Sequence, residues 1–127
     1  MVHVVKTTLK AKSNVIINTV DKFVPAGLSL VVNSADIEVN EYGYGCILVS
    51  AGTETGTATL DVKYQVKGTD GVYYDHTSAT QITGAGSALT KITALDGITG
   101  RIVVTIVGSS EADGYADVYV EFITKTR

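Results

Sequence analysis

The stretch TATLDVKYQVK, residues 57–67, decides the fold class of this sequence. Every second position in it is apolar, namely Leu60, Val62, Tyr64 and Val66. The positions between them are polar, namely Thr59, Asp61, Lys63, Gln65 and Lys67. Because successive side chains of a β-strand point to opposite faces, this pattern predicts a strand with one buried and one solvated face. We expect Asp to be tolerated at Thr59 or Gln65 on the solvated face.

Two later stretches predict further core strands. RIVVTIV, residues 101–107, is apolar on both faces, as expected for a central strand of a sheet. YADVYVEFIT, residues 115–124, alternates, and its predicted outward side chains are Tyr115, Asp117, Tyr119 and Glu121. The side chains of the three strands that we predict to be buried are Leu60, Val62, Ile102, Val104, Ile106, Ala116, Val118, Val120 and Phe122.

The composition supports an all-β domain. The 127 residues include 18 Val and 17 Thr, which favour pleated sheets, with 13 Gly and a single Pro. Further candidate strands are residues 2–9, 14–20, 27–33, 36–40, 45–51, 80–83 and 89–93. Short strands separated by glycine-rich turns predict one antiparallel β-sandwich, of the jelly-roll type, with an immunoglobulin-like strand order as the alternative.

Several features of the sequence indicate where the protein is made and where it acts. Cys46 is the only cysteine, so no internal disulfide forms, and we expect it to be a small buried hydrophobe. The first 20 residues lack the apolar core of a signal peptide, and no apolar run approaches the roughly 18 residues that span a bilayer. We therefore expect a soluble protein, made in a reducing cytoplasm, that does not act at a membrane.

The charge is unevenly distributed along the chain. Residues 1–22 carry four lysines and one aspartate, a net charge of +3, whereas residues 23–127 have a net charge of −6. A basic leading segment on an acidic body is typical of a docking arm, so we predict an arm at 1–22 and a sandwich at 23–127. The alternative is that 1–22 forms edge strands. Nucleic acid is not expected as a partner, because the segment lacks arginine and aromatic residues.

The densest polar cluster lies in KYQVKGTDGVYYDHTS, residues 63–78. Asp70-Gly71 predicts a hairpin, as both central residues of a type I′ turn need positive φ. Its return strand carries Tyr73, Tyr74, Asp75 and His76, a candidate ligand surface in which the two tyrosines would stack on a sugar.

The same cluster gives little support to a metal site or an active site. One His with nearby carboxylates is a poor zinc set, and Ser78 beside His76 lacks a nucleophile-elbow context. A second acidic loop with Glu111, Asp113 and Asp117 does not have the spacing of a calcium loop. We expect no enzymatic activity and no cofactor.

Three segments together resemble small structural proteins of tailed bacteriophages. They are GTATLDVKYQVKGTDGVYYD (56–75), GRIVVTIVGSSEADGYADVYVEFI (100–123) and the earlier ADIEVNEYGYGCILVSAG (35–52). The resemblance covers roughly residues 33–124, and Thr69 stands where the family pattern usually has Ser in the hairpin. It implies a β-sandwich or jelly roll that coats or cements a capsid, often as a trimer, without catalytic residues.

The expected function is therefore decoration of the outer surface of a phage head, with the major capsid protein as partner and a homotrimer as the assembly. The residues predicted to dock on the capsid are Val2, His3, Val4, Val5, Lys6, Lys10 and Lys12. An extended arm can add a strand to a neighbouring sheet edge, where main-chain hydrogen bonds supply affinity. The alternative is a carbohydrate-binding or receptor-binding module of a phage tail or fibre, with Tyr73 and Tyr74 at its surface.

Overall fold

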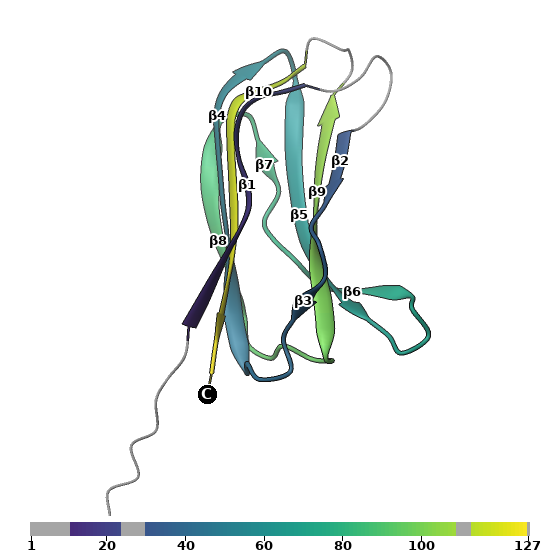
Figure 1. The fold of residues 1–127 in the computed structure, drawn as a ribbon. Helices are drawn as coiled ribbons and strands as arrows, with labels where there is room; N and C mark the ends of the chain where they lie inside the picture. Colours follow the sequence, from purple (N-terminus) through teal and green to yellow (C-terminus); the bar gives the residue numbers. More distant parts are fainter. Residues whose placement is uncertain (1–10, 24–29, 109–112, 127) are drawn as a thin grey trace, which may run out of the picture.

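A computed structural model describes residues 11–23, 30–108 and 113–126, which form strands and turns (Figure 1). The strands are β1 (Ala11–Phe23), β2 (Leu30–Asn33), β3 (Ile37–Glu38), β4 (Tyr44–Thr55), β5 (Ala58–Lys67), β6 (Tyr73–Ser78), β7 (Ile82–Thr83), β8 (Gly86–Ile92), β9 (Thr99–Gly108) and β10 (Gly114–Lys125). Within these ranges there is no helix of the length and hydropathy that would cross a membrane.

The strands form two antiparallel sheets that face each other (Figure 1). Sheet A has the order β1-β10-β4-β8. Sheet B has the order β2-β9-β5-β6, with β3 also paired to β9 and β7 to β5. The pairs β2/β3 and β6/β7 thus behave as two interrupted strands, each running along one neighbour.

The strand pairing is nested and identifies the fold as a jelly roll. In sequence order, the first strand pairs with the last, β2/β3 with β9, β4 with β8, and β5 with β6/β7. Successive pairs lie alternately in sheet A and sheet B, which is the arrangement of a double-sheet jelly roll. The predicted all-β sandwich of jelly-roll type is confirmed, and the strand order is not immunoglobulin-like.

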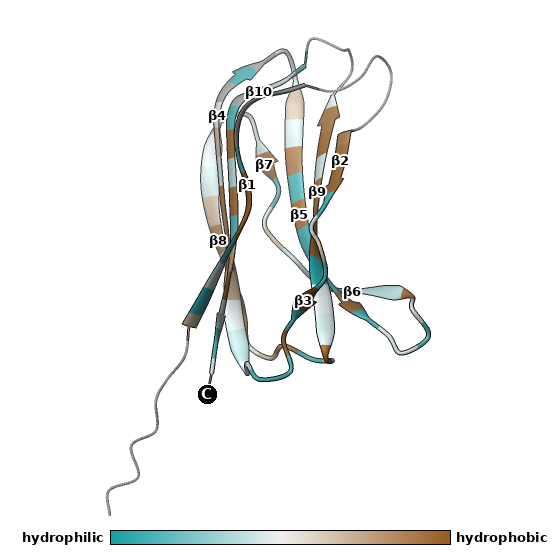
Figure 2. Cartoon of the chain, viewed as in Figure 1, coloured by the Kyte–Doolittle hydropathy of each residue, from teal (hydrophilic) through white to brown (hydrophobic). Residues whose placement is uncertain are grey.

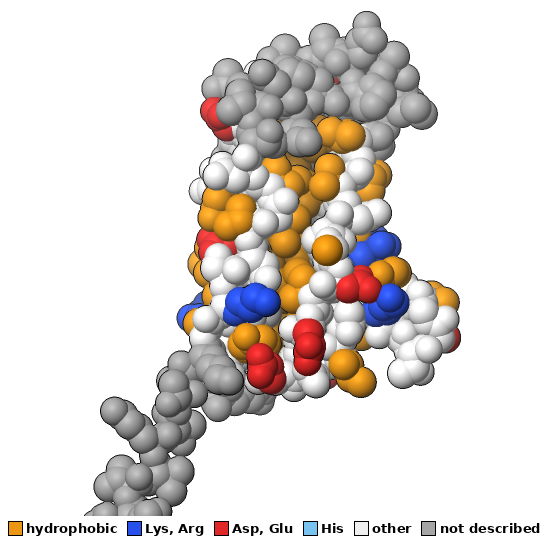
Figure 3. Space-filling view, viewed as in Figure 1, with side chains coloured by type: hydrophobic (Ala, Val, Ile, Leu, Met, Phe, Trp, Pro, Cys, Tyr) orange, Lys and Arg blue, Asp and Glu red, His pale blue; other side chains and the backbone are white. Residues whose placement is uncertain are grey.

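The core lies between the sheets and contains the predicted inward residues. All of those with described side chains are buried, and Tyr64 of β5 meets Phe122 of β10 with ring centroids 5.3 Å apart. Apolar and polar residues alternate along β5, as Figure 2 shows, whereas the middle of β9 is apolar at three consecutive positions. Apolar side chains also reach the surface as a strip between the two sheets on the side shown in Figure 3. Ala116 was also predicted to point inward, but its side chain is not among those that the structure describes.

Two predicted outward residues are instead buried. Tyr115 is fully buried, and its hydroxyl donates to the carbonyl oxygen of Ala58 at 3.0 Å. The reason is that β10 curves over the end of the sandwich, as Figure 1 shows, so alternation fails there. Burial raises the pKa of Tyr115 to about 12. Gln65 is only 8% exposed, because side chains of β6 and β9 cover it on both sides.

The leading segment divides at residue 11. Residues 1–10, with the predicted docking residues Val2, His3, Val4, Val5, Lys6 and Lys10, lie outside the described residues. Ala11–Phe23 pairs with β10 along its length as β1, an edge strand of sheet A with a bulge between Val15 and Ile17. The predicted boundary after residue 22 falls inside this strand, and the described part of the leading segment is an edge strand, as in the alternative prediction.

Candidate functional site

The β5–β6 hairpin differs from the predicted two-residue turn. Gly71 N donates to Gly68 O at 3.0 Å, which makes Thr69 and Asp70 the central residues. Gly71 follows with φ of +82°, a conformation that L side chains rarely adopt. The connection is therefore a turn followed by a glycine in the left-handed conformation. Hairpin loops of this kind are one residue longer than the two-residue turn that was predicted. Asp70 accepts the Val72 N–H at 2.9 Å, so its role is structural.

A connected polar network covers the outer face of sheet B. Lys63 Nζ lies 3.0 Å from Asp75 Oδ1, and Gln65 Nε2 donates to the same oxygen at 2.7 Å. The Gln65 Oε1 accepts the Arg101 Nε–H at 2.9 Å. Arg101 then stacks on Tyr73, with its guanidinium carbon 3.6 Å from the ring centroid. Such a chain fixes the rotamers of all five side chains.

Asp36 closes the other end of this network. Its carboxylate accepts from Lys67 Nζ at 2.8 Å and from the hydroxyl of Tyr73. These two hydrogen bonds, that of Lys67 first, lower the pKa of Asp36 below its ordinary value. The pKa of Asp75 is lowered in the same way, first by the hydrogen bond from Gln65 and then by Lys63. Figure 3 shows side chains of both charges next to each other beside β6.

The predicted ligand surface of β6 is divided between two faces. Tyr73 and Asp75 lie with the polar network, whereas Tyr74 pairs with Val66 and donates to Asp70 at 2.7 Å. A bulge at His76 turns that ring toward the core side, where it meets Tyr64 at 5.3 Å. The two tyrosines therefore do not form one stacking platform, because neighbours on a strand point in opposite directions.

A hydroxyl, an imidazole and a carboxylate meet at His76. His76 Nδ1 lies 2.6 Å from Thr77 Oγ1, and Nε2 lies 2.8 Å from Asp96 Oδ2. The order of the three groups resembles a nucleophile–base–acid chain, but catalysis also needs positioned donors that stabilise an oxyanion, so this order alone does not define an active site. The arrangement orients the ring that packs edge-on against Tyr64. Sequence reasoning missed Asp96, which is 20 residues away.

The described carboxylates that were considered for metal binding are not part of a metal-binding group. Among the described residues, no group of three or more His, Cys, Asp or Glu side chains could hold a metal ion. Asp113 is buried and Asp117 is exposed, while Glu111 lies outside the description. The expectation that the protein uses no metal and has no enzymatic activity remains a prediction.

The outer face of sheet A has a different character. Its cross-strand rows run from β1 through β10 and β4 to β8: Ser13–Ile123–Cys46–Lys91 and Val15–Glu121–Leu48–Leu89. A third row places Ala11 beside Lys125, and Lys125 beside Tyr44. These rows bring apolar side chains from all four strands onto one solvated surface. We call Tyr44, Cys46, Leu48, Leu89, Lys91, Ile123 and Lys125 together the groove face.

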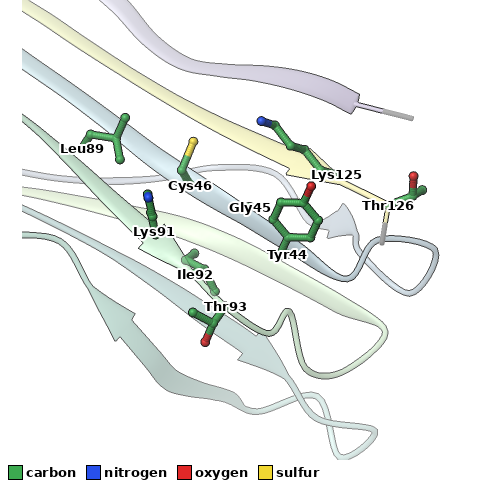
Figure 4. Close-up of a pocket in the computed structure, with 9 residues that line it drawn as sticks. All are labelled: Tyr44, Gly45, Cys46, Leu89, Lys91, Ile92, Thr93, Lys125 and Thr126. Carbon is green, nitrogen blue, oxygen red and sulfur yellow. The ribbon is translucent and has the colours of Figure 1, made fainter. Parts of the chain in front are cut away.

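An open groove of about 850 Å³ lies on the groove face. Leu89, Cys46 and Lys91 project from the same side of the sheet, and Lys125 reaches over from β10 (Figure 4). Gly45 lies in the groove wall, where a Cβ would collide with the carbonyl oxygen of Ile123. The glycine thus keeps β4 and β10 in close register under the groove.

The lysines of this face lack acidic partners. Over the ranges described, Lys91 and Lys125 make no ion pair, and the same is true of Lys12, the described member of the predicted docking set. Glu121, the carboxylate within these rows, accepts from Ser13 and from Tyr119. Leu89 is 57% exposed and Val15 is 54% exposed. The result is an apolar surface with free positive charge.

Comparisons with known proteins identify relatives in fold only. No protein-family model matches the sequence, and no curated protein matches it significantly. A mutant VP2 protein of infectious bursal disease virus, in derived T=1 particles, superimposes with a TM-score of 0.57 at 11% identity, covering 94% of this chain and 32% of that chain. The SPBc2 prophage-derived protein YomS gives a TM-score of 0.52 at 13% identity, covering 98% of this chain and 100% of that chain.

A structure of the Gx strain of infectious bursal disease virus also matches, with a TM-score of 0.55 at 11% identity. The chain spans about a third of the length of that viral chain, covering 33% of it, whereas 94% of this chain is covered. At such identities the similarity establishes a shared β-sandwich fold with viral and prophage-derived proteins.

Proposed function

We propose that this protein is a virion structural protein that decorates the outside of a phage head. The observation that carries the proposal is the jelly-roll strand order, found in a chain that matches a prophage-derived protein over the full length of both. Viral coat proteins with the same fold support it. The phage-like segments of the sequence include most of β4, β5, β9 and β10, the strands at the centre of the two sheets, together with β3 and the start of β6.

In this proposal the partner is the major capsid protein, and the assembly is a trimer. Residues 1–10 act as the docking arm, since they contribute Lys6 and Lys10 and lead into β1 at the edge of sheet A. Several weak contacts in one trimer make the attachment multivalent and much tighter than each contact alone. The mature location is then the head exterior.

Co-expression tests the proposal directly. The chain is produced with the major capsid protein encoded in the same genome, and particles are separated on a density gradient. We expect the protein to co-sediment with heads and to be absent from the head fraction when the capsid protein is omitted. Absence from heads that form normally would contradict the proposed function.

A variant lacking residues 1–10 tests the arm. Its thermal melt should match that of the full chain, because β1 begins at Ala11, while head binding should fall at least about tenfold, or about 1.4 kcal/mol. A variant with Lys6→Ala and Lys10→Ala serves as a control for charge alone. A truncated protein that fails to fold, or that binds heads as tightly as the full chain, would exclude the arm.

A further inference from the structure

The groove face combines features that point to a protein partner. Leu89 and Tyr44 are exposed to 57% and 37%, and they lie with Leu48, Cys46 and Ile123 on a flat sheet surface. An exposed apolar patch with a polar rim is typical of interaction sites. The open groove of about 850 Å³, whose lining includes Tyr44, Cys46 and Leu89, has room for a protruding side chain or loop.

The charge on this face specifies the chemistry of that partner. Lys91 and Lys125 stand at the groove without acidic partners in the described part of the chain. On sheet B, by contrast, Lys63 and Lys67 each pair with a carboxylate. A surface that presents an apolar side chain between carboxylates would therefore satisfy both the groove and its lysines.

Two other occupants fit less well. In a two-fold dimer through this face, each patch meets its own copy, so the lysines of both copies would be brought together. Nucleic acid is disfavoured because the centre of the face is apolar and has no arginine. The acidic protein surface is thus the occupant that the charges favour.

We propose that the groove face is the docking surface for an acidic protein partner, with Leu89 as its apolar contact and Lys91 and Lys125 as its charged contacts. Resting on the proposed function, this partner is the exterior of the phage head. Binding through this face would turn sheet A toward the capsid and sheet B toward solvent.

Head binding by matched variants tests this inference. Leu89→Asp and the pair Lys91→Gln with Lys125→Gln should each weaken binding about tenfold or more, because central contacts dominate interface energies. Two controls change sheet B and its hairpin. The first is Val31→Asp, at a residue that is 52% exposed. The second combines Thr69→Glu with Ser78→Glu, and it gives the protein the same net charge as the double lysine variant. These should bind within about twofold of wild type.

The outcomes separate this inference from the proposed function. If wild type does not bind heads, the proposed function fails and the inference fails with it. If wild type binds but the groove variants bind equally well, only the inference is overturned. Gel filtration supplies a third outcome, because self-association of wild type that Leu89→Asp abolishes would show that a second copy covers the face and would also overturn it. All variants should retain the wild-type thermal melt.

Discussion

The outer faces of the two sheets use charged residues in opposite ways. On sheet B, Lys63 and Arg101 contact side chains of neighbouring strands, and Lys67 pairs with Asp36 in the connection between β2 and β3. Gln65 is buried among them. On sheet A, the lysines at the groove have no acidic partner in the described ranges, and apolar side chains lie between them. The two faces belong to one sandwich and share one core.

This difference suggests a division of tasks between the faces. A network whose members satisfy one another rigidifies a sheet and leaves little to offer a partner. A face with solvated apolar side chains and unpaired cations contributes little to the stability of the fold. Its side chains remain able to form contacts with a partner. Sheet B should therefore be sensitive to mutation in stability, and sheet A in binding.

The largest expected effects concern the core, where the two sheets should behave alike. Tyr64→Ala on sheet B and Phe122→Ala on sheet A should each reduce the free energy of unfolding by about 3–5 kcal/mol. Both rings are fully buried and lie against each other. Chemical denaturation measures the loss of stability. A variant of either residue that retains wild-type stability would show that this ring is not part of the core shared by the two sheets.

A medium effect should distinguish the outer faces. Gln65→Leu should cost about 1–3 kcal/mol, since it removes the donor to Asp75 and the acceptor of Arg101 in a buried site. Leu89→Ser, at an exposed position of sheet A, should change stability by no more than about 0.5 kcal/mol. Equal losses in the two variants, measured by urea unfolding, would remove the distinction between the faces.

The smallest expected effect is a pH dependence confined to sheet B. The folded state lowers the pKa of Asp36 below its ordinary value of 3.8, so the stabilisation is present above that value and is lost as pH falls through the lowered pKa. Asp36→Asn should therefore lower the Tm near pH 7 and have less effect near pH 2.5.

Asp117→Asn is the control for the loss of one exposed carboxylate. Asp117 is exposed on the outer face of sheet A and has no hydrogen-bond or ion-pair partner within the described ranges. Near pH 7 this variant should have a Tm close to that of wild type, because the substitution removes no such contact. A loss of Tm near pH 7 as large as that of Asp36→Asn would contradict the assignment of the effect to the network.

Much of the core could be predicted from the sequence, because the alternation in residues 57–67 and 101–107 is that of strands with a buried face. The nested strand order could not be derived from alternation alone, since pairing depends on contacts distant in sequence. Gln65 was misassigned because its burial depends on Arg101 and Asp75 of two other strands. Tyr115 was misassigned because alternation does not record the curvature of a strand.

The groove face was missed for a related reason. Its side chains come from three strands, β4, β8 and β10, and each strand contributes only two or three of them. One signal was present: Cys46–Val49 is apolar at four consecutive positions, yet Leu48 and Cys46 lie on the outer face. A strand that is apolar on both faces either lies between two layers or presents one face to a partner.

Lysine labelling of free and head-bound protein tests the contrast between the faces most directly. An amine-reactive reagent, read out by peptide mass spectrometry, compares Lys91 and Lys125 with Lys63 and Lys67 in one sample. Lys91 and Lys125 should lose reactivity several-fold on binding to heads, whereas the reactivity of Lys63 and Lys67 should not change. Protection of Lys63 and Lys67 instead, or unchanged reactivity of Lys91 and Lys125 in bound protein, would contradict this contrast.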